Sequence, residues 1–437
     1  MTPASGVLDA TLAPATSGAR DALAPASSGA RDALAPASSG VLDALLSEPE
    51  GDARRRAATA WESAAGSCAD RIVLMGAGGL GRRLLAGLRA DGIEPLAFAD
   101  NRRSLWGTDV DGVEVLAPAD AAARFGRTAA FAVAIWGAGS SHRFEHSAAQ
   151  LSAFGCTMVL PVAPLAWRHA QHVLPHYAMD LPHGVVACAD DVRAAYALLG
   201  DQRSRDEFVE QVRFRLTGDP SALARPVRGP QYLLTDVAAP VAGEVVVDCG
   251  AYDGDTLTSW LNVRGPTFSR YIALEPDPDS RARLVALVDG LADDVRDRVT
   301  VLPWAAAATR GTARFSPTGT AASALGDAIA TGTGTPGGDG GCVVECRPLD
   351  DVLAGEAPTF VKMDIEGAEP GALEGGRTVL AAAQPVLAVS AYHAQDHLWR
   401  LPLLVHDILP DHALALRPHN EEGWDLVLYA APPSRAV

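Results

Sequence analysis

Short apolar runs alternate with amphipathic stretches throughout the second half of the chain. Apolar runs of about four to eight residues indicate buried strands, and apolar spacings of three and four indicate helices, so this alternation predicts a largely parallel α/β sheet. The last two runs are separated only by a polar turn at 420–424, and we expect them to pair as an antiparallel hairpin. Strands are expected at 244–250, 270–275, 299–304, 342–347, 359–364, 385–391, 412–417 and 424–430. Helices are expected to begin near Asp255, Asp277, Glu369 and Asp396.

A second, shorter alternation of the same kind lies upstream and predicts a small Rossmann-like parallel sheet. Its strands are expected within 72–81, 94–101, 131–139 and 157–162. The residues between the two alternations are predicted to be helical, and we expect the charged stretch 201–216 to present a solvated helix face. The sequence thus predicts an α/β protein with two Rossmann-like parallel-sheet domains, at 70–168 and 241–432, and a helical connector at 169–240.

The first 60 residues follow a different pattern. The unit SGARDALAPAS occurs at 17–27 and again at 28–38, with Pro and Gly inside each copy. Ordering such a segment costs more conformational entropy than burying a few Leu and Ala side chains returns. We therefore expect 1–60 to be a flexible tail, with a docking segment for a partner as the alternative. The Gly-rich stretch 331–341 is expected to be a mobile surface loop.

Composition and charge exclude several classes of protein. Hydrophobic residues make up 48% of the 437 and charged residues 20%, which suits a chain that buries cores. The formal net charge of −17 disfavours nucleic acid as a partner, because such binding depends on cationic side chains. No apolar run reaches the roughly 18 residues of a membrane span, and no basic start precedes an apolar block. The six scattered cysteines complete no zinc knuckle, so we expect free thiols in a cytoplasmic protein.

The most informative motif is VVVDCGAYDGDT at 245–256, where a buried strand enters a glycine turn and then a helix start. Gly250 and Gly254 let the backbone approach a ligand closely. Asp248, Asp253 and Asp255 make the turn acidic, so it would repel a pyrophosphate and favour a cation. S-adenosylmethionine carries a sulfonium and an ammonium group, and it fits such a turn on charge grounds.

The next strand, 271–276, ends in Glu275. A carboxylate at this place can accept hydrogen bonds from two adjacent ribose hydroxyls. The alternative is an acid that merely precedes a helix. The remaining predicted cofactor contacts are Ala251, Tyr252, Trp304 and Ala305.

Two further strands end in groups that can carry chemistry. VKMDIEGAE, at 361–369, presents Asp364 and Glu366, and VLAVSAYH, at 386–393, ends in His393. Carboxyl ends of parallel strands share one edge, so we expect these groups over the same cleft as the glycine turn. His393 would take a proton from an acceptor hydroxyl, with Asp364 or Glu366 orienting its imidazole. One alternative is a structural histidine, and another makes the three residues ligands of a divalent cation.

Two other features carry less weight. Lys362, inside the apolar strand before these acids, is expected to pair with one of them or to mark a sheet edge. Four histidines lie close together upstream, but Pro175 interrupts the helix that would align them, and we expect no metal there. They are His169, His172, His176 and His183.

The C-terminal half resembles the FkbM-type S-adenosylmethionine-dependent methyltransferases from about Val245 to Ala430. The resemblance is carried by VDCGAYDGDT, LEPDP, VKMDIEGAE, SAYH and LVLYA, in the same order and spacing. It implies a class I methyltransferase fold, S-adenosylmethionine as cofactor, and the glycine turn and Glu275 as cofactor contacts. It also implies methyl transfer to a hydroxyl, usually of a sugar or polyketide, without naming the small-molecule or glycan acceptor.

The upstream alternation resembles the N-terminal nucleotide-sugar-binding domain of sugar acyltransferases. MGAGGLG, FADN, WGTDVDGVEVL and IWGAGSSHR carry this resemblance. Gly76, Gly78 and Gly81 have the spacing of a dinucleotide turn and Asp100 follows, which also allows NAD, but no Tyr and Lys pair for hydride transfer follows. A nucleotide-sugar or docking role, a structural role and NAD binding stay open. A second hypothesis for the whole protein is a nucleotide-sugar sensor with a methyltransferase-like scaffold.

Overall fold

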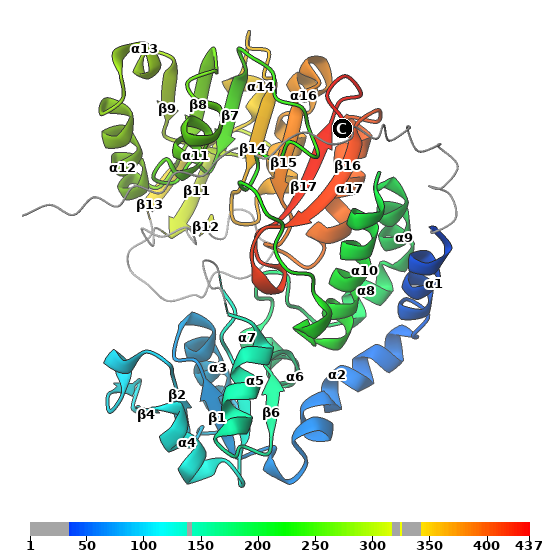
Figure 1. Ribbon diagram of the computed structural model, residues 1–437, viewed down its shortest axis with the longest axis vertical. Coiled ribbons are helices and arrows are strands. Elements are labelled where there is room, and N and C mark those ends of the chain that lie inside the picture. The colour runs from blue at the N-terminus through cyan, green and yellow to red at the C-terminus, as the bar shows by residue number, and fades with distance from the viewer. Residues whose placement is uncertain (1–34, 138–141, 317–323, 326–341) are drawn as a thin grey trace, which may run out of the picture.

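The computed structural model describes residues 35–137, 142–316, 324–325 and 342–437. Two α/β units lie at opposite ends of the molecule, and helices of the connector lie beside the C-terminal unit (Figure 1). Both predicted parallel sheets are present, so the predicted fold class is confirmed. Within the described ranges, no helix combines the length and the apolar character that crossing a bilayer requires. All six cysteines are free thiols, as expected.

The described residues of the C-terminal unit form a seven-stranded sheet in the order β16-β17-β15-β14-β7-β8-β9. Strand β17 pairs antiparallel with both β15 and β16, and the other neighbours are parallel. This order and the terminal hairpin are those of a class I methyltransferase fold, as predicted. The strands are β7 (Val245–Cys249), β8 (Arg270–Leu274), β9 (Val299–Leu302), β14 (Phe360–Met363), β15 (Val386–Ser390), β16 (Ala413–Pro418) and β17 (Leu426–Ala431).

Helices flank this sheet, and the four predicted helix starts agree with the structure to within one residue. Asp277, for example, caps its helix by accepting a hydrogen bond from the Ser280 amide at 3.1 Å. The strands between the helices are buried on both faces, which explains their continuous apolar runs. The helices are α11 (Asp255–Arg264), α12 (Pro278–Asp289), α13 (Asp293–Arg296), α14 (Leu349–Val352), α15 (Glu369–Gly375), α16 (Arg377–Ala383) and α17 (His397–Ile408).

One predicted strand belongs to a separate, smaller sheet. Strand β13 (Cys342–Arg347) pairs with β10 (Trp304–Ala306) and β11 (Gly311–Ser316), and β11 also pairs with β12 (Ala324–Leu325). Val343 is 67% exposed whereas Val344 is 6% exposed, so β13 buries one face only. Strand alternation of this kind suits an outlying sheet rather than the centre of a parallel one. The predicted surface loop 331–341 lies outside the described residues.

The N-terminal unit has the strand order β3-β4-β2-β1-β5-β6 among its described residues. Its four predicted strands are confirmed as β1 (Ile72–Met75), β2 (Ala97–Ala99), β5 (Ala130–Val133) and β6 (Val159–Pro161). The sheet is extended by β3 (Asp109–Val110) and β4 (Val113–Leu116), which were not predicted. Helices α3 (Gly79–Ala90), α4 (Pro118–Phe125) and α5 (Phe144–Ala153) complete the unit.

The connector is helical as predicted, and its charged stretch is solvated only in part, because Arg203 and Asp206 are exposed while three other polar residues of the same helix are buried. Glu207, Gln211 and Arg215 are 4%, 1% and 2% exposed. The Gln211 amide donates to Glu207 at 2.8 Å, and Arg215 donates to the Gln211 side-chain oxygen at 2.6 Å. Because these groups hydrogen-bond to one another at i, i+4 spacing, the helix can bury most of their polar atoms. The connector helices are α7 (Ala170–Val173), α8 (His183–Ala187), α9 (Ala189–Leu198) and α10 (Gln202–Thr217), and α6 (Ala163–Arg168) precedes them at the end of the N-terminal unit.

The prediction of a flexible tail at 1–60 is wrong from residue 35 onward. Helices α1 (Ala35–Leu45) and α2 (Glu50–Ala65) occupy that segment, and residues 1–34 lie outside the described part. Leu42 is 2% exposed, and Trp61 is fully buried with its indole N–H donating to the Ala69 carbonyl at 2.8 Å. The apolar residues that follow the repeats therefore bury enough surface to offset the entropy of ordering.

Candidate functional site

The glycine turn after β7 lies against the end of β14. Gly250 and Gly254 have φ values of 78° and 93°, in the left-handed region that favours glycine. A Cβ atom on Gly250 would lie 2.0 Å from the Asp364 carbonyl oxygen, so the approach requires a residue without a side chain. The predicted cofactor turn and the predicted catalytic strand end are thus in direct contact.

Beneath this turn, Lys362 and Asp248 form a buried ion pair. The Lys362 Nζ lies 3.0 Å from Asp248 Oδ1, and the two side chains are 2% and 0% exposed. Nζ also donates to the Gly250 carbonyl at 2.6 Å, and the Tyr271 hydroxyl donates to Asp248 Oδ2 at 2.7 Å. Asp248, predicted to contact the cofactor, is fully buried and supports the turn from below.

The partner of Lys362 differs from the expectation as well. It does not pair with an acid that follows it in the sequence, nor does it mark an edge, because β14 lies inside the sheet. Lys362 and Asp248 are directly opposite each other in the β14 and β7 pairing. Burial alone would lower the pKa of Lys362, but the nearby carboxylates, Asp248 foremost, outweigh that effect and raise it. The ammonium therefore keeps its charge inside the sheet.

Glu275 lies at the end of β8, beside the turn. Its carboxylate accepts a hydrogen bond from the Tyr252 amide and another from the Asp277 amide, each at 2.7 Å. Burial raises the pKa of Glu275 to about 7, although these two amides act in the opposite direction. An ionised carboxylate has about four acceptor positions, so two remain for hydroxyl donors such as those of a ribose.

The other predicted cofactor residues are divided between two elements. Ala251 is fully buried in the turn, while Asp253 has a side chain 40% exposed and 4.0 Å from Arg283. Trp304 and Ala305 lie on β10, where the Arg347 guanidinium is 3.7 Å from the Trp304 ring centroid. The structure therefore brings the turn together with Glu275, and it places Trp304 in the smaller sheet.

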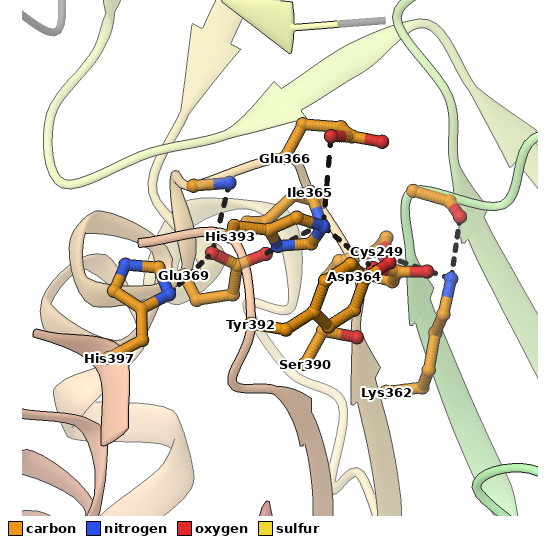
Figure 2. Close-up of polar contacts among 12 residues, drawn as sticks. Cys249, Lys362, Asp364, Ile365, Glu366, Glu369, Ser390, Tyr392, His393 and His397 are labelled. Carbon is orange, nitrogen blue, oxygen red and sulfur yellow. Dashed lines mark hydrogen bonds and ion pairs between the residues drawn. The ribbon is translucent and has the colours of Figure 1, made fainter. Parts of the chain in front are cut away.

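At the ends of β14 and β15, Asp364, Glu366 and His393 lie together as the sequence suggested (Figure 2). His393 Nε2 is 3.4 Å from Asp364 Oδ1 and 3.7 Å from Glu366 Oε2. The imidazole is held from its other nitrogen, because Nδ1 is 2.8 Å from Glu369 Oε1. Glu369 therefore orients the ring, in place of the two acids predicted to do so.

The charges of this cluster shift one another. Burial would raise the pKa of Glu369, but His393 above all, with His397 and a backbone amide, lowers it to about 2. Burial would lower the pKa of His393, but Glu369, Glu366 and Asp364 raise it to about 10. Burial raises the pKa of Glu366 to about 8, against the effect of His393. The raised pKa of His393 and the lowered pKa of Glu369 have one cause, the buried contact between Nδ1 and the Glu369 carboxylate.

Aromatic residues that the sequence analysis did not assign surround the cluster. The Tyr232 hydroxyl donates to Asp364 Oδ2 at 2.8 Å, and the Tyr392 ring lies 4.2 Å from that of His393. Tyr177, from the connector, lies 6.1 Å from His393 and 4.6 Å from Trp424, which follows β16. Tyr177, Tyr232, Tyr392 and Trp424 thus form an aromatic wall around the cluster. The SAYH motif was the only sequence signal for this wall, because the other residues come from distant segments.

In the N-terminal unit, the predicted glycine turn also forms. Gly76 has a φ of 115°, and a Cβ on Gly81 would lie 2.0 Å from the Gly76 carbonyl oxygen. Gly78 precedes helix α3, and Asp100 accepts a hydrogen bond from the Ala77 amide at 2.8 Å. The four predicted residues are thus adjacent, and the Arg102 guanidinium also binds Asp100, at 2.9 Å.

The two units meet close to the aromatic wall. Arg143, 4% exposed, donates to Glu421 Oε2 at 2.8 Å, and the Trp136 indole N–H donates to the Glu422 carbonyl at 3.1 Å. Trp136 and Trp424 have ring centroids 4.9 Å apart. The end of β5 in the N-terminal sheet is thereby connected to the loop between β16 and β17.

The strand order of the C-terminal sheet is that of a class I methyltransferase fold, and comparison with known proteins gives a family likeness for part of the chain. Residues 248–415 match the family model described as "Methyltransferase FkbM domain", so this segment is similar to the FkbM methyltransferase domains. The crystal structure of methyltransferase FkbM from Methylobacillus flagellatus KT is similar over 91% of this chain and 99% of that chain, with a TM-score of 0.66 and 24% sequence identity. That likeness extends the shared fold beyond the matched domain.

Two further solved structures are much more distant. Precorrin-6y C5,15-methyltransferase from Geobacter metallireducens GS-15 has a TM-score of 0.26 and 14% identity, over 44% of this chain and 82% of that chain. Fibrillarin from Aeropyrum pernix, solved with natively bound S-adenosyl-L-methionine, has a TM-score of 0.23 and 11% identity, over 44% and 67%. No curated protein matches the sequence. The resemblance of the N-terminal unit to sugar acyltransferases stays a prediction.

Proposed function

We propose that this methyltransferase uses S-adenosylmethionine to methylate a hydroxyl group of a small molecule, with a sugar or glycan as the favoured acceptor class. The observation that supports this most strongly is the contact between Gly250 and the Asp364 carbonyl. It joins the predicted cofactor turn to the cluster of Asp364, Glu366 and His393, so the methyl donor and the groups that handle a proton would share one cleft.

In this proposal, the acidic turn receives the cofactor and Glu275 accepts the ribose hydroxyls. Tyr252 and Asp253 line the turn, and the buried pair of Lys362 and Asp248 keeps its backbone in place. A sulfonium is an activated methyl donor, so the main task of the protein is to align the hydroxyl with the methyl group. The hydroxyl proton leaves toward the acidic cluster beside it. A cytoplasmic location stays a prediction from the sequence.

Replacing Glu275 by glutamine is expected to weaken S-adenosylmethionine binding about 10- to 100-fold, because hydrogen bonds to a charged group contribute about 1.5–3 kcal/mol. Calorimetric titration of the full chain measures this dissociation constant. Glu374→Gln, in an exposed side chain on α15, is the matched control and should leave it unchanged. An unaltered dissociation constant in Glu275→Gln would remove the ribose role.

The same residue predicts a pH dependence of cofactor binding. Because burial raises the pKa of Glu275 to about 7, its carboxylate ionises within the neutral range. Hydroxyl donors stabilise the ionised form, so binding lowers this pKa and the affinity should rise between about pH 6 and pH 8. The Glu275→Gln variant should show a flatter profile in the same calorimetric series. Equal profiles for the two proteins would contradict the assignment.

For the N-terminal unit we propose a docking role for a nucleotide-bearing molecule, supported by the close glycine turn before α3. Thermal-shift measurements with several nucleotide sugars and NAD should raise the melting temperature of the protein for at least one nucleotide sugar. Gly81→Ala, whose Cβ would overlap the Gly76 carbonyl, should abolish that shift and keep the shift caused by S-adenosylmethionine. A melting temperature that no nucleotide changes would favour a structural role.

A further inference from the structure

We propose that Asp364, Glu366 and His393 bind a divalent cation next to the methyl-transfer site, and that Glu369 orients the imidazole toward it. The binding inference rests on side-chain geometry alone, whereas the role of the cation rests on the proposed function. The cation would bind the acceptor hydroxyl through its oxygen and help it to release a proton to water. The oxygen would then take the methyl group, and S-adenosylhomocysteine would leave.

The distances suit ligands of one ion. Two ligand atoms at about 2.1 Å from a cation and at right angles to each other lie roughly 3 Å apart. His393 Nε2 is 3.4 Å from an Asp364 oxygen and 3.7 Å from a Glu366 oxygen, so small side-chain shifts bring the three atoms into position. Ligand atoms of Asp364, Glu369 and His393 lie within 4.8 Å of one another. Glu366 is not part of that set, so its side chain has to move toward Asp364 before the three proposed ligands can share one ion.

An independent observation concerns His393 Nε2. The side chain is 1% exposed, and among the described residues this buried nitrogen has no hydrogen-bond partner. A buried polar atom without a partner is costly, and a bound water or ion is one of the ways in which a protein satisfies it. Figure 2 shows that this nitrogen faces Asp364 and Glu366, which are the residues that would share the ion.

Glu369 has the position of a residue that supports a metal ligand. Its carboxylate lies 2.8 Å from Nδ1 of His393. It also accepts hydrogen bonds from the backbone amides of Ile365 and Gly367, at 2.9 and 3.1 Å. With its oxygens thus engaged, it is a positioning residue rather than a ligand. A carboxylate on the far nitrogen of a ligating histidine fixes the tautomer that leaves the lone pair on Nε2.

The cluster is open to an entering ion and has the right charge. The side chains of Asp364 and Glu366 are 28% and 14% exposed, so coordination positions toward solvent remain. Glu366 has a φ of 55°, a conformation that costs free energy in a residue with a side chain. Two carboxylates and one imidazole with open positions suit a first-row divalent cation, for which Mn²⁺ is a convenient probe.

The test is a titration of the chelator-treated full chain with Mn²⁺, followed by electron paramagnetic resonance of the free ion, without cofactor or acceptor. We expect one ion per chain. Asp364→Asn and His393→Gln should each weaken binding at least tenfold, and Glu369→Gln about 10- to 100-fold. Glu374→Gln, on the same helix as Glu369 but exposed, should bind as the unchanged protein does.

Absence of Mn²⁺ binding, or equal affinity in all four variants, would overturn the cation site. Calorimetry with S-adenosylmethionine on the same samples separates the two proposals, because cofactor binding without Mn²⁺ binding contradicts only the cation. If a variant does not fold, oxidative cleavage of the unchanged protein by Fe²⁺ and ascorbate locates the ion. Cuts near 364–366 and 393 support the site, and cuts elsewhere overturn it.

Discussion

Replacing Lys362 by methionine is expected to lower the free energy of unfolding by about 3–5 kcal/mol, because it leaves a buried carboxylate without its cation. Asp248 is 0% exposed. Among the described residues, the side chains that contact its carboxylate are the Lys362 ammonium and the Tyr271 hydroxyl. The same substitution removes the donor that holds the Gly250 carbonyl. Urea denaturation followed by circular dichroism measures the change.

The double variant Asp248→Asn with Lys362→Met is the control for this prediction. It removes both charges, and replacing a buried ion pair by neutral groups is often close to neutral in stability. We therefore expect it to recover part of the lost free energy, which gives a clear coupling in the double-mutant cycle. A loss below about 1 kcal/mol in Lys362→Met would show that the ion pair does not stabilise the sheet.

Replacing His393 by alanine is expected to reduce turnover about 10²- to 10⁴-fold, the usual contribution of a group that assists proton removal. The reason is that three carboxylates are arranged around this imidazole, so its loss disperses the whole cluster. Cofactor affinity should change little, because the turn and Glu275 are held by other contacts. Mass spectrometry of candidate glycans incubated with isotope-labelled S-adenosylmethionine measures methyl incorporation.

The control for His393 is His406→Ala, on the outer part of α17, which should keep full turnover. A comparison of kcat with KM then separates chemistry from binding: loss of kcat at constant cofactor dissociation constant supports a role in the reaction. Turnover close to that of the unchanged protein in His393→Ala would remove this residue from the mechanism.

Local sequence patterns predicted the strands and helix starts well, because each depends on a few adjacent residues. They could not supply lateral neighbours. Lys362 faces Asp248 only because β14 pairs with β7 across more than a hundred residues of sequence, and no periodicity encodes that register. For the same reason the strand at 342–347 was identified correctly while its membership in a separate sheet was not.

The candidate site was predicted in part for similar reasons. Asp364, Glu366 and His393 end parallel strands, so the general rule for such sheets brought them together. Glu369 was assigned only to a helix start, where glutamate is common, and its contact with His393 depends on how α15 returns over the strand end. Tyr232 and Tyr177 come from the connector, where the sequence carries no motif.

Lys362 is also the only lysine in the sequence, and it is 2% exposed within the sheet. Amine-directed chemistry, whether a cross-linker, an acyl donor or a surface-coupling reagent, therefore has no accessible lysine on the folded described structure. Such a reagent could reach this side chain only when the strands beneath the glycine turn separate.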